Sequence, residues 1–412
     1  MEIGRQRQEP SHAERKPTTS SVQHFGLPKK RMTVFFYANI FPDDSSSGVT
    51  KKVLAQVSAL RKMGHKVFLT GYTSTGVLIL NNENVVVYAR DFSLWQKVVP
   101  SFFRRSLLIR SSLLFLRKHP DQFDCVYARF HYFDPLYLKM LRTARQNGAK
   151  NVVEAHAFPN YQLSLRPLQV PLSPLLPFYL LDSVCNGYAR KVVDLVAAMS
   201  PAEMIWGIKT VRVENALNVD EFTPRRPDNT SDTVHVLFIA YERVSHGFDR
   251  VVVGLSRYYN EGGSRDIVVD FVGVPLPSTK DLIEKLGLSN KFLFHGPQSG
   301  KALDAAYDHS DLAFGHLGNH RIGSYSGSSI KVSEYLAKGI PFVYAWNELR
   351  VSDQFPFALR LPLDDSPVDF FRVLAFLDGL GNPKDVSEKI RGYCSSLPRW
   401  EEQFEKVFSE LD

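Results

Sequence analysis

The chain has 412 residues, of which 44% are apolar and 23% charged, a composition that is ordinary for a globular protein with more than one core. Its formal net charge of +7 is uneven, because residues 1–206 hold 27 Lys and Arg against 14 Asp and Glu. The three separated cysteines exclude a disulfide framework, and no apolar run is long enough for a transmembrane helix. The basic first half suggests an anionic partner such as a phospholipid surface, a lipid diphosphate or nucleic acid.

The first part of the chain divides into a tail and an alternating α/β segment. Residues 1–31 are polar and charged without periodicity, which predicts a disordered tail. Buried strands then alternate with amphipathic helices over residues 32–214, which predicts a Rossmann-like domain with a parallel sheet. We expect strands at 32–38, 65–70, 85–88, 124–128, 151–155 and 193–199, and helices at 49–63 and 136–145.

The second part repeats this rhythm after a break. Residues 215–227 are polar and contain Pro224 and Pro227, so we interpret them as a linker. A second Rossmann-like domain is predicted over 228–388, and residues 389–412 should form a helix that packs back toward the first domain. We expect strands at 234–239, 267–272, 291–295, 312–315 and 342–345, and helices at 249–259, 280–286, 301–309 and 328–339. The fold class is therefore α/β, with two Rossmann-like domains facing a cleft.

The expected helix at 328–339 carries the most informative pattern. Ser328 or Ser329 can cap its N-terminus, and Gly339 can close its C-terminus. Lys331 lies in the first turn, where the helix dipole repels a cation unless an anion is bound there. Glu334 shares a face with Lys331 and could accept from sugar hydroxyls, so phosphate plus ribose suggests a nucleotide. The alternative is a surface ion pair between these two side chains, which needs no ligand.

Other polar residues follow the carboxyl ends of predicted strands, where open parallel sheets bind their ligands. Each has a plain structural alternative, such as a turn glycine, a hydrogen-bonded histidine or a solvated helix start. Together they would gather around one anionic ligand. They are Gly48, His156, Tyr241, Arg243, His246, Gly247, Arg250, His320 and Arg321.

These motifs, in this order, give the chain a family resemblance. It resembles bacterial glycosyltransferases of the two-domain GT-B fold, especially the family 4-like enzymes of capsule and exopolysaccharide gene clusters. The matching pieces are the Gly48 loop, residues 60–67, 154–157, 213–222, 246–250 and 318–321, and the 328–341 helix. The resemblance implies transfer of a sugar from a nucleotide-diphosphate sugar to a glycan or a lipid-linked acceptor. It favours retention of anomeric configuration over inversion.

The resemblance also implies roles for single residues. Lys331, Arg250 and the His246–Gly247 turn would hold the donor diphosphate, Glu334 the ribose, and His156 would lie near the reacting bond. The implied catalytic residues are thus His156, Lys331 and Glu334. The other implied donor-binding residues are Gly48, Arg243, His246, Gly247, Arg250, Arg321, Ser326, Ser328 and Ser329.

The chain also departs from the family pattern. Ser326 stands where the family has a glutamate, eight positions before Glu334, and His246 takes the place of a lysine. Asp43-Asp44 and Asp364-Asp365 are better interpreted as turn residues than as a metal-binding Asp-x-Asp motif, so we expect no cofactor and metal-independent transfer.

Residues 94–119 interleave six basic residues with large apolar ones, which is typical of a helix lying in a membrane interface. A second apolar, proline-rich segment covers 165–181, and the alternative for both is ordinary core packing. The interface interpretation predicts a cytoplasmic protein bound peripherally to the inner face of the cell membrane, reaching a polyprenyl-diphosphate-linked acceptor. Two other functions stay open: a GT-B-shaped sugar-nucleotide epimerase or other nucleotide-sugar-binding protein, and a non-catalytic nucleic-acid-binding module, which no basic-aromatic motif supports.

Overall fold

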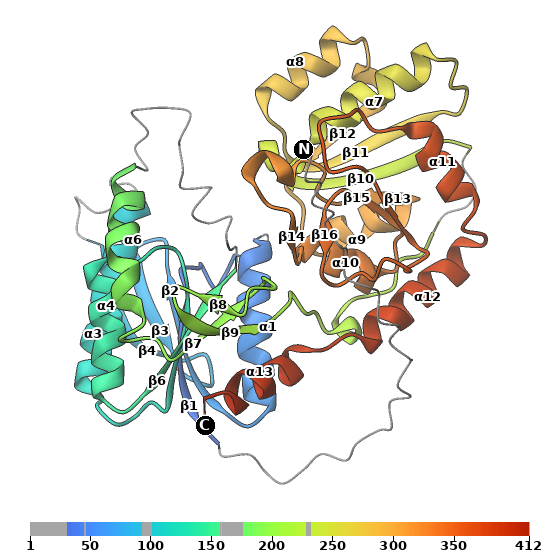
Figure 1. Cartoon of the computed structure of the whole chain (residues 1–412). Coiled ribbons are helices and arrows are strands. Elements are labelled where there is room, and N and C mark those ends of the chain that lie inside the picture. The colour runs from blue at the N-terminus through green and yellow to red at the C-terminus, as the bar shows by residue number, and fades with distance from the viewer. Residues whose placement is uncertain are drawn as a thin grey trace, which may run out of the picture. The chain divides into compact units, whose positions relative to one another are not determined.

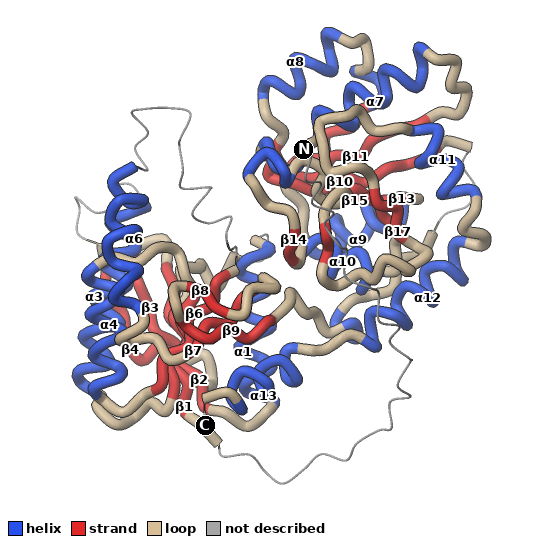
Figure 2. Tube along the Cα trace, viewed as in Figure 1, coloured by secondary structure: helices blue, strands red, loops and turns tan. Residues whose placement is uncertain are grey.

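A computed structural model describes residues 31–44, 47–92, 101–156, 158, 176–227 and 232–411 (Figure 1). The predicted tail lies outside this part of the chain except for Arg31. Figure 2 shows two α/β halves, each built around a central sheet. Among the described residues, no helix combines the length and apolar character that crossing a bilayer requires.

The N-terminal half contains a nine-stranded sheet in the order β4-β3-β2-β1-β5-β6-β7-β9-β8. Strands β1, β2, β5, β6, β7 and β9 run parallel, whereas β3, β4 and β8 join as antiparallel neighbours. The bounds are β1 Thr33–Tyr37, β2 Lys66–Tyr72, β3 Gly76–Leu80, β4 Val86–Asp91, β5 Cys125–Arg129, β6 Lys150–Ala155, β7 Leu195–Ala198, β8 Met204–Ile205 and β9 Ile208–Arg212. The sequence did not predict β3, β8 or β9.

Helices cover both faces of this sheet (Figure 1). One face packs α3 (Ser101–Lys118), α4 (Pro135–Gln146) and α6 (Leu176–Ala189), and the other packs α1 (Gly48–Lys62) and α13 (Trp400–Ser409). The N-terminus of α4 begins where expected because the Asp134 side chain accepts from two backbone N–H groups of its first turn and Pro135 suits that position. The same role in α1 belongs to Ser47, which accepts from the N–H of Thr50.

Helix α3 is a core helix rather than a free amphipathic helix at a membrane interface. Leu108, Ile109 and Leu116 are at most 1% exposed and belong to the hydrophobic cluster on the sheet. Arg105 is also buried, where its guanidinium forms an ion pair with Asp134. The apolar face of 101–118 therefore packs on the sheet, and the opposite side of the helix stays exposed. Residues 93–100 and most of the second apolar segment, 165–175, lie outside the described part.

The C-terminal half contains a six-stranded parallel sheet in the order β12-β11-β10-β13-β15-β17. Helices α7, α8 and α11 pack on one face, and α9, α10 and α12 on the other. The strands are β10 Val234–Tyr241, β11 Ile267–Val274, β12 Phe292–Gly296, β13 Leu312–Phe314, β15 Phe342–Tyr344 and β17 Ala358–Arg360, with a separate pair β14 Ser326–Gly327 and β16 Asn347–Glu348. The helices are α7 Phe248–Asn260, α8 Pro277–Lys285, α9 Gly300–His309, α10 Ile330–Lys338, α11 Phe370–Asp378 and α12 Pro383–Ser396, with short 3-10 turns η1 Val219–Glu221, η2 Val244–His246, η3 Ser289–Lys291 and η4 Asn319–Ile322.

Two segments join the halves. The predicted boundary at residue 389 falls inside α12, whose Ile390 packs in the C-terminal half, whereas Trp400 and Phe404 of α13 pack against the N-terminal sheet. The predicted linker is partly packed against the C-terminal half. Its Asn215 and Arg225 are buried, and Arg225 donates to the carbonyl of Ser310.

Candidate functional site

The N-terminus of α10 is closed by a carboxylate rather than left open. Ser329 precedes the helix as its N-cap, but its side chain makes no capping bond. Instead the backbone N–H of Ser329 donates to both carboxylate oxygens of Glu348, at 3.2 and 3.0 Å. Burial raises the pKa of Glu348 to about 8 in spite of these hydrogen bonds. Sequence reasoning missed Glu348, and an anion at this helix would have to use the N–H groups of the first turn, which follow Ser329.

Lys331 lies in this first turn, and its ammonium group has no hydrogen-bond partner in the described part of the chain. Its Nζ is inaccessible to solvent and makes no hydrogen bond to any residue that the structure describes. Nζ lies over the ring of Phe238, 5.3 Å from the ring centroid, which is a cation–π distance. Burial lowers the pKa of Lys331 to about 7, although Glu334 and Glu242 oppose this shift. A buried, unsatisfied cation in the first turn of a helix is what an anionic ligand would stabilise.

Two imidazole rings accompany Lys331. His246 ends η2 and His316 follows β13, and their ring centroids lie 5.0 Å apart. Burial lowers the pKa of both rings well below the ordinary value, with a further contribution from the Lys331 charge. The backbone N–H of Arg243 donates to Nδ1 of His246 at 2.9 Å, which leaves Nε2 of the neutral ring as a donor. Sequence reasoning found His246 and missed His316, although His316 also comes directly after a strand.

Gly247 allows two loops to cross in close contact beside these rings. Its φ is +66°, and a Cβ there would lie 2.8 Å from the backbone nitrogen of Gly318. A Cβ on Gly318 would in turn lie 2.7 Å from the carbonyl oxygen of Val244. The two glycines therefore hold the loops that carry His246 and His316 at backbone contact distance.

Replacement of Gly247 by alanine is expected to lower the free energy of unfolding by more than the roughly 1–2 kcal/mol that a left-handed non-glycine residue costs. The excess comes from the clash of Cβ with backbone atoms, which cannot rotate away. Gly262→Ala is the matched control, because Gly262 also has a positive φ (+89°) but faces open space. Denaturant unfolding of both variants measures the difference. Equal losses would show that the loops can separate freely.

The N-terminal half contributes to the same region through the first turn of α1. Lys51 Nζ lies 3.6 Å from Oε1 of Glu334, and the hydroxyl of Tyr307 donates to Oε2 at 3.2 Å. A Cβ on Gly48 would lie 3.6 Å from Ile330, an ordinary contact, so close approach does not require a glycine there. The starts of α1 and α10 thus meet, each with a lysine in its first turn. Lys51 was missed, although the signal that identified Lys331 applies to it equally.

Two predicted donor-binding arginines, one of them expected at the diphosphate, have partners within the protein. Arg250 is 2% exposed and donates to the carbonyls of Leu317, Ser366 and Pro362. Arg321 forms a bidentate ion pair with Asp249 at 2.8 Å and bonds to Asp365 at 2.6 Å. Both guanidinium groups therefore have partners within the protein, and donor binding by Arg250 and Arg321 stays a prediction that would require them to exchange these partners.

The predicted serines are also engaged locally. Ser326 Oγ accepts from the side chain of Asn347 at 3.0 Å, in the short β14–β16 pair. Ser328 accepts from the backbone N–H of Asn215 through Oγ and from its side chain through the carbonyl, which attaches the linker to the start of α10. Of these three serines, Ser329 has an Oγ that is buried without a hydrogen-bond partner among the described residues. The side chain of Arg243 is exposed, and its backbone rather than its guanidinium orients His246.

His156 lies at the carboxyl end of β6, near His131 and Arg129. Its ring centroid is 6.0 Å from that of His131, which follows β5. Burial lowers the pKa of His156 well below its usual value, and the charge of Arg129 adds to the effect. Burial also lowers the pKa of His131 to about 3. His156 is therefore a neutral imidazole at physiological pH, and sequence reasoning missed Arg129 and His131 next to it.

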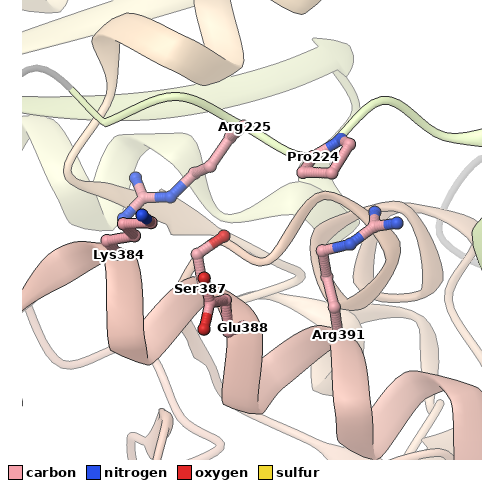
Figure 3. A pocket seen from close by; sticks show the side chains of 6 residues that line it. All are labelled: Pro224, Arg225, Lys384, Ser387, Glu388 and Arg391. Atoms are coloured by element: carbon pink, nitrogen blue, oxygen red, sulfur yellow. The ribbon is translucent and has the colours of Figure 1, made fainter.

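A separate hollow lies between the linker and α12 (Figure 3). Two of its cations are already used: Arg225 donates to Ser310, and Arg391 donates to the carbonyls of Phe222, Ala337 and Val219. Neither Lys331 nor His156 lines this hollow, so it is not assigned as the site. The described residues place no group of three metal-ligating side chains at those strand ends.

No protein-family model matches the chain, and no curated protein matches it. Several solved structures do match the chain. Sucrose-phosphate synthase from Thermosynechococcus elongatus has a TM-score of 0.70 at 14% identity, covering 92% of this chain and 99% of that one. The catalytic domain of starch synthase IV from Arabidopsis thaliana, bound to ADP and acarbose, scores 0.62 at 12% identity, covering 93% and 99%. Anabaena HepE in complex with UDP-glucose scores 0.59 at 14% identity, covering 92% and 100%.

These likenesses establish the fold, which is the glycosyltransferase GT-B arrangement of two Rossmann-like halves. The α/β fold class predicted from the sequence is confirmed. The identities are too low to carry an activity across, so the activity must be argued from the residues of this chain.

Proposed function

We propose that this protein is a glycosyltransferase that moves a sugar from a nucleotide-diphosphate sugar to a glycan or lipid-linked acceptor. The observation that carries the proposal is the buried ammonium of Lys331, without a hydrogen-bond partner among the described residues, at the meeting point of two helix N-termini. Lys331, Lys51 and the helix dipoles create a positive potential there. A nucleotide diphosphate carries the complementary charge. The nucleotide sugar in HepE and the ADP in starch synthase IV support this choice of ligand.

In the proposed reaction the bond between the anomeric carbon and the diphosphate breaks, and a bond forms between that carbon and an acceptor hydroxyl oxygen. The hydroxyl proton passes to the leaving diphosphate, on whose oxygens negative charge grows as the bond breaks. Lys331 stabilises that charge with a buried ammonium group, and burial strengthens its electrostatic interactions. The Nε2–H of neutral His246 adds a hydrogen-bond donor, and Glu334 accepts from ribose hydroxyls. His156, neutral and close to Arg129, is proposed to contact the donor sugar near the reacting bond. No metal is needed in this scheme, and we propose retention of configuration.

The acceptor is proposed to be lipid-linked and to belong to bacterial surface polysaccharide synthesis, with the protein at the cytoplasmic face of the cell membrane. Support comes from the outward side of α3, where Phe103 and Leu114 are 50% and 40% exposed. Exposed Arg110, Arg117 and Lys118 recur on the same side at helical spacing. Cations next to apolar side chains suit an anionic lipid surface.

The direct test is a thermal-shift screen with uridine, guanosine, adenosine and cytidine diphosphates and their sugars, since a ligand of the native state raises apparent stability. Sugar release is then measured with and without candidate acceptors. Acceptor-dependent transfer supports the proposal, and turnover of the sugar nucleotide alone to an isomer would support an epimerase. If none of the nucleotides stabilises the protein, the proposed site is wrong.

Nucleotide binding is also expected to take up a proton near pH 8. In the free protein the pKa of Lys331 is about 7, so the amine is mostly neutral at pH 8. A bound diphosphate favours the ammonium form and raises this pKa, so affinity should fall as pH rises above about 7, by up to roughly tenfold per pH unit. Calorimetry in buffers of different ionisation enthalpy counts the proton. Lys331→Arg is the control, because guanidinium stays charged and should show no uptake. Binding without proton uptake in the unmodified protein would place the diphosphate elsewhere.

A further inference from the structure

The C-terminal sheet carries a polar cluster on the face that otherwise packs against α9, α10 and α12. Asp270 lies in the middle of β11, is 4% exposed, and shares its face with Leu237 and Val272 of the apolar core. A buried carboxylate in such surroundings is costly unless both oxygens are satisfied. His235 bonds to Oδ2 through Nδ1 at 2.8 Å, and His295 bonds to Oδ1 through Nε2 at 2.7 Å.

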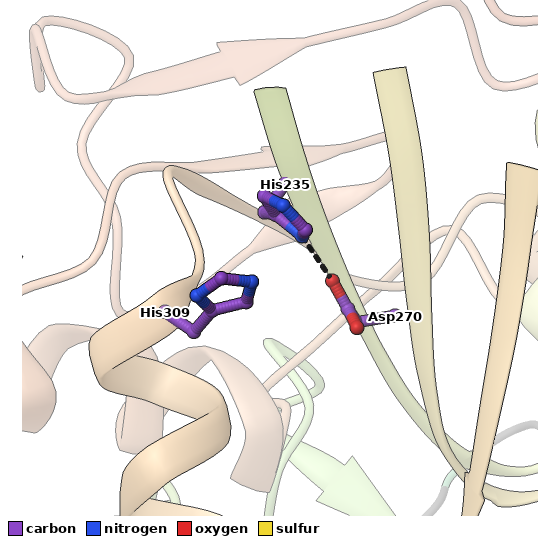
Figure 4. A group of neighbouring side chains, drawn as sticks. All are labelled: His235, Asp270 and His309. Atoms are coloured by element: carbon purple, nitrogen blue, oxygen red, sulfur yellow. Dashed lines mark hydrogen bonds and ion pairs between the residues drawn. The ribbon is translucent and has the colours of Figure 1, made fainter. Parts of the chain in front are cut away.

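A third imidazole completes the cluster from a different element. His309 is the last residue of α9, and its ring centroid lies 3.9 Å from that of His235. Figure 4 shows the two rings and the Asp270 carboxylate facing one another from α9, β10 and β11. One ligand atom from each of these three residues lies within 4.8 Å of the other two.

We infer that His235, Asp270 and His309 form a binding site for a divalent transition-metal ion, with zinc as the best fit. Two imidazoles and a carboxylate are ligands that zinc accepts, whereas magnesium and calcium prefer oxygen ligands alone. Zinc–nitrogen bonds of about 2.0–2.1 Å place tetrahedral ligand atoms about 3.3 Å apart. Nδ1 of His235 and Oδ2 of Asp270, now 2.8 Å apart, would separate slightly, and ligand atoms up to 4.8 Å apart would close by up to about 1.5 Å. Exposed His309, at a helix end, can make that movement. Water or His295 supplies the fourth ligand.

The site differs in place and purpose from the proposed donor site. His235 is the second residue of β10, whereas Arg243 and His246 follow the carboxyl end of that strand. A metal here would tie the end of α9 to the sheet. Tyr307 lies two residues before His309 and donates to Glu334, the residue proposed to accept hydrogen bonds from the ribose. A metal on His309 would therefore help to hold Tyr307, and through it Glu334, in place. Metal binding itself does not depend on the proposed transfer reaction.

The test uses untagged, chelator-treated protein titrated with Zn²⁺ by calorimetry and with Co²⁺ by visible absorption. We expect one zinc per chain, a rise in melting temperature that EDTA reverses, and the absorption of four-coordinate cobalt. Binding should release protons, because the ligands must be deprotonated. The variant His309→Ala should weaken zinc binding by at least about tenfold, with folding unaffected because the side chain is exposed.

His119→Ala is the matched control, since His119 bonds to the carbonyl of Phe115 in the other half and should bind zinc as the unmodified protein does. Zinc affinity that is equal in His309→Ala and unmodified protein would overturn the proposal. So would the absence of saturable binding, and Asp270 would then be satisfied by its two histidine hydrogen bonds alone.

Discussion

Replacement of Lys331 by methionine is expected to reduce glycosyl transfer by about 10²–10³-fold and at the same time to raise the melting temperature. The loss of activity follows because the ammonium group would stabilise charge that develops on the leaving diphosphate. The gain in stability follows because the ammonium is buried without a hydrogen-bond partner among the described residues, and its burial lowers its pKa to about 7. Methionine fills nearly the same space without a charge. Opposite changes in stability and turnover would distinguish a ligand-binding lysine from a structural one.

Lys338→Met provides the matched comparison in the same helix. Lys338 is also buried, but its Nζ donates to the carbonyl of Thr223 at 3.0 Å and forms an ion pair with Asp304. Its loss should lower the melting temperature and leave turnover per folded molecule nearly unchanged. Turnover is measured with the donor identified in the nucleotide screen, and stability by thermal unfolding without nucleotide. A Lys331→Met variant that is active, or that is as destabilised as Lys338→Met, contradicts the assignment of Lys331 to the diphosphate.

Local sequence signals were sufficient for elements that alternate as strand and helix. Runs such as Cys125–Arg129 are buried along their whole length, and helices such as Pro135–Gln146 carry caps that can be seen in the sequence. Strands β3 and β9 were missed because each belongs to an antiparallel hairpin inside a pattern that predicted only βαβ units. The turn before β9 is made by Trp206 and Gly207, both with positive φ. A tryptophan in that conformation gives no turn signal in the sequence.

The candidate site shows the same division between local and distant causes. The position of Lys331 in the first turn of a helix is a local property, so the sequence was enough to single it out. The partners of Arg250 and Arg321 lie more than 40 positions away, at Ser366 and Asp365, and no local pattern could show that these guanidinium groups are already occupied. Glu348 was missed for the same reason, because it reaches the start of α10 from β16. A charged residue after a strand is therefore a weaker indicator of a ligand site than a cation in the first turn of a helix, where the helix dipole opposes it.

The largest stability effect in the described residues is expected at Glu154, the carboxylate beneath His156. Glu154 is 1% exposed, accepts from Lys52 at 2.7 Å and Gln56 at 2.6 Å, and lies 3.7 Å from Arg129. The charges of Lys52 and Arg129 hold the pKa of Glu154 at about 2 although burial opposes this. Burial nevertheless lowers the pKa of Lys52 to about 8, and the charge of Arg129 adds to this shift while Glu154 opposes it. Among the described residues Glu154 is the ion-pair partner of both Lys52 and Arg129, so removing its charge leaves two buried cations without that partner.

Glu154→Gln is therefore expected to lower the free energy of unfolding at pH 7 by about 3–5 kcal/mol, since breaking a buried ion pair on one side leaves an uncompensated charge. The folded pKa of Glu154 is depressed from 4.5, so its contribution is fully present above about pH 4.5 and is lost as pH falls toward 2. The difference between the variant and the unmodified protein should shrink over that window. Glu221→Gln is the control, because the exposed Lys62–Glu221 pair at 3.3 Å should contribute at most about 1 kcal/mol. Denaturant titrations at several pH values measure both. A loss that does not change between pH 7 and pH 3 would mean that shape and hydrogen bonding, not charge, hold this end of β6 and the histidine that follows it.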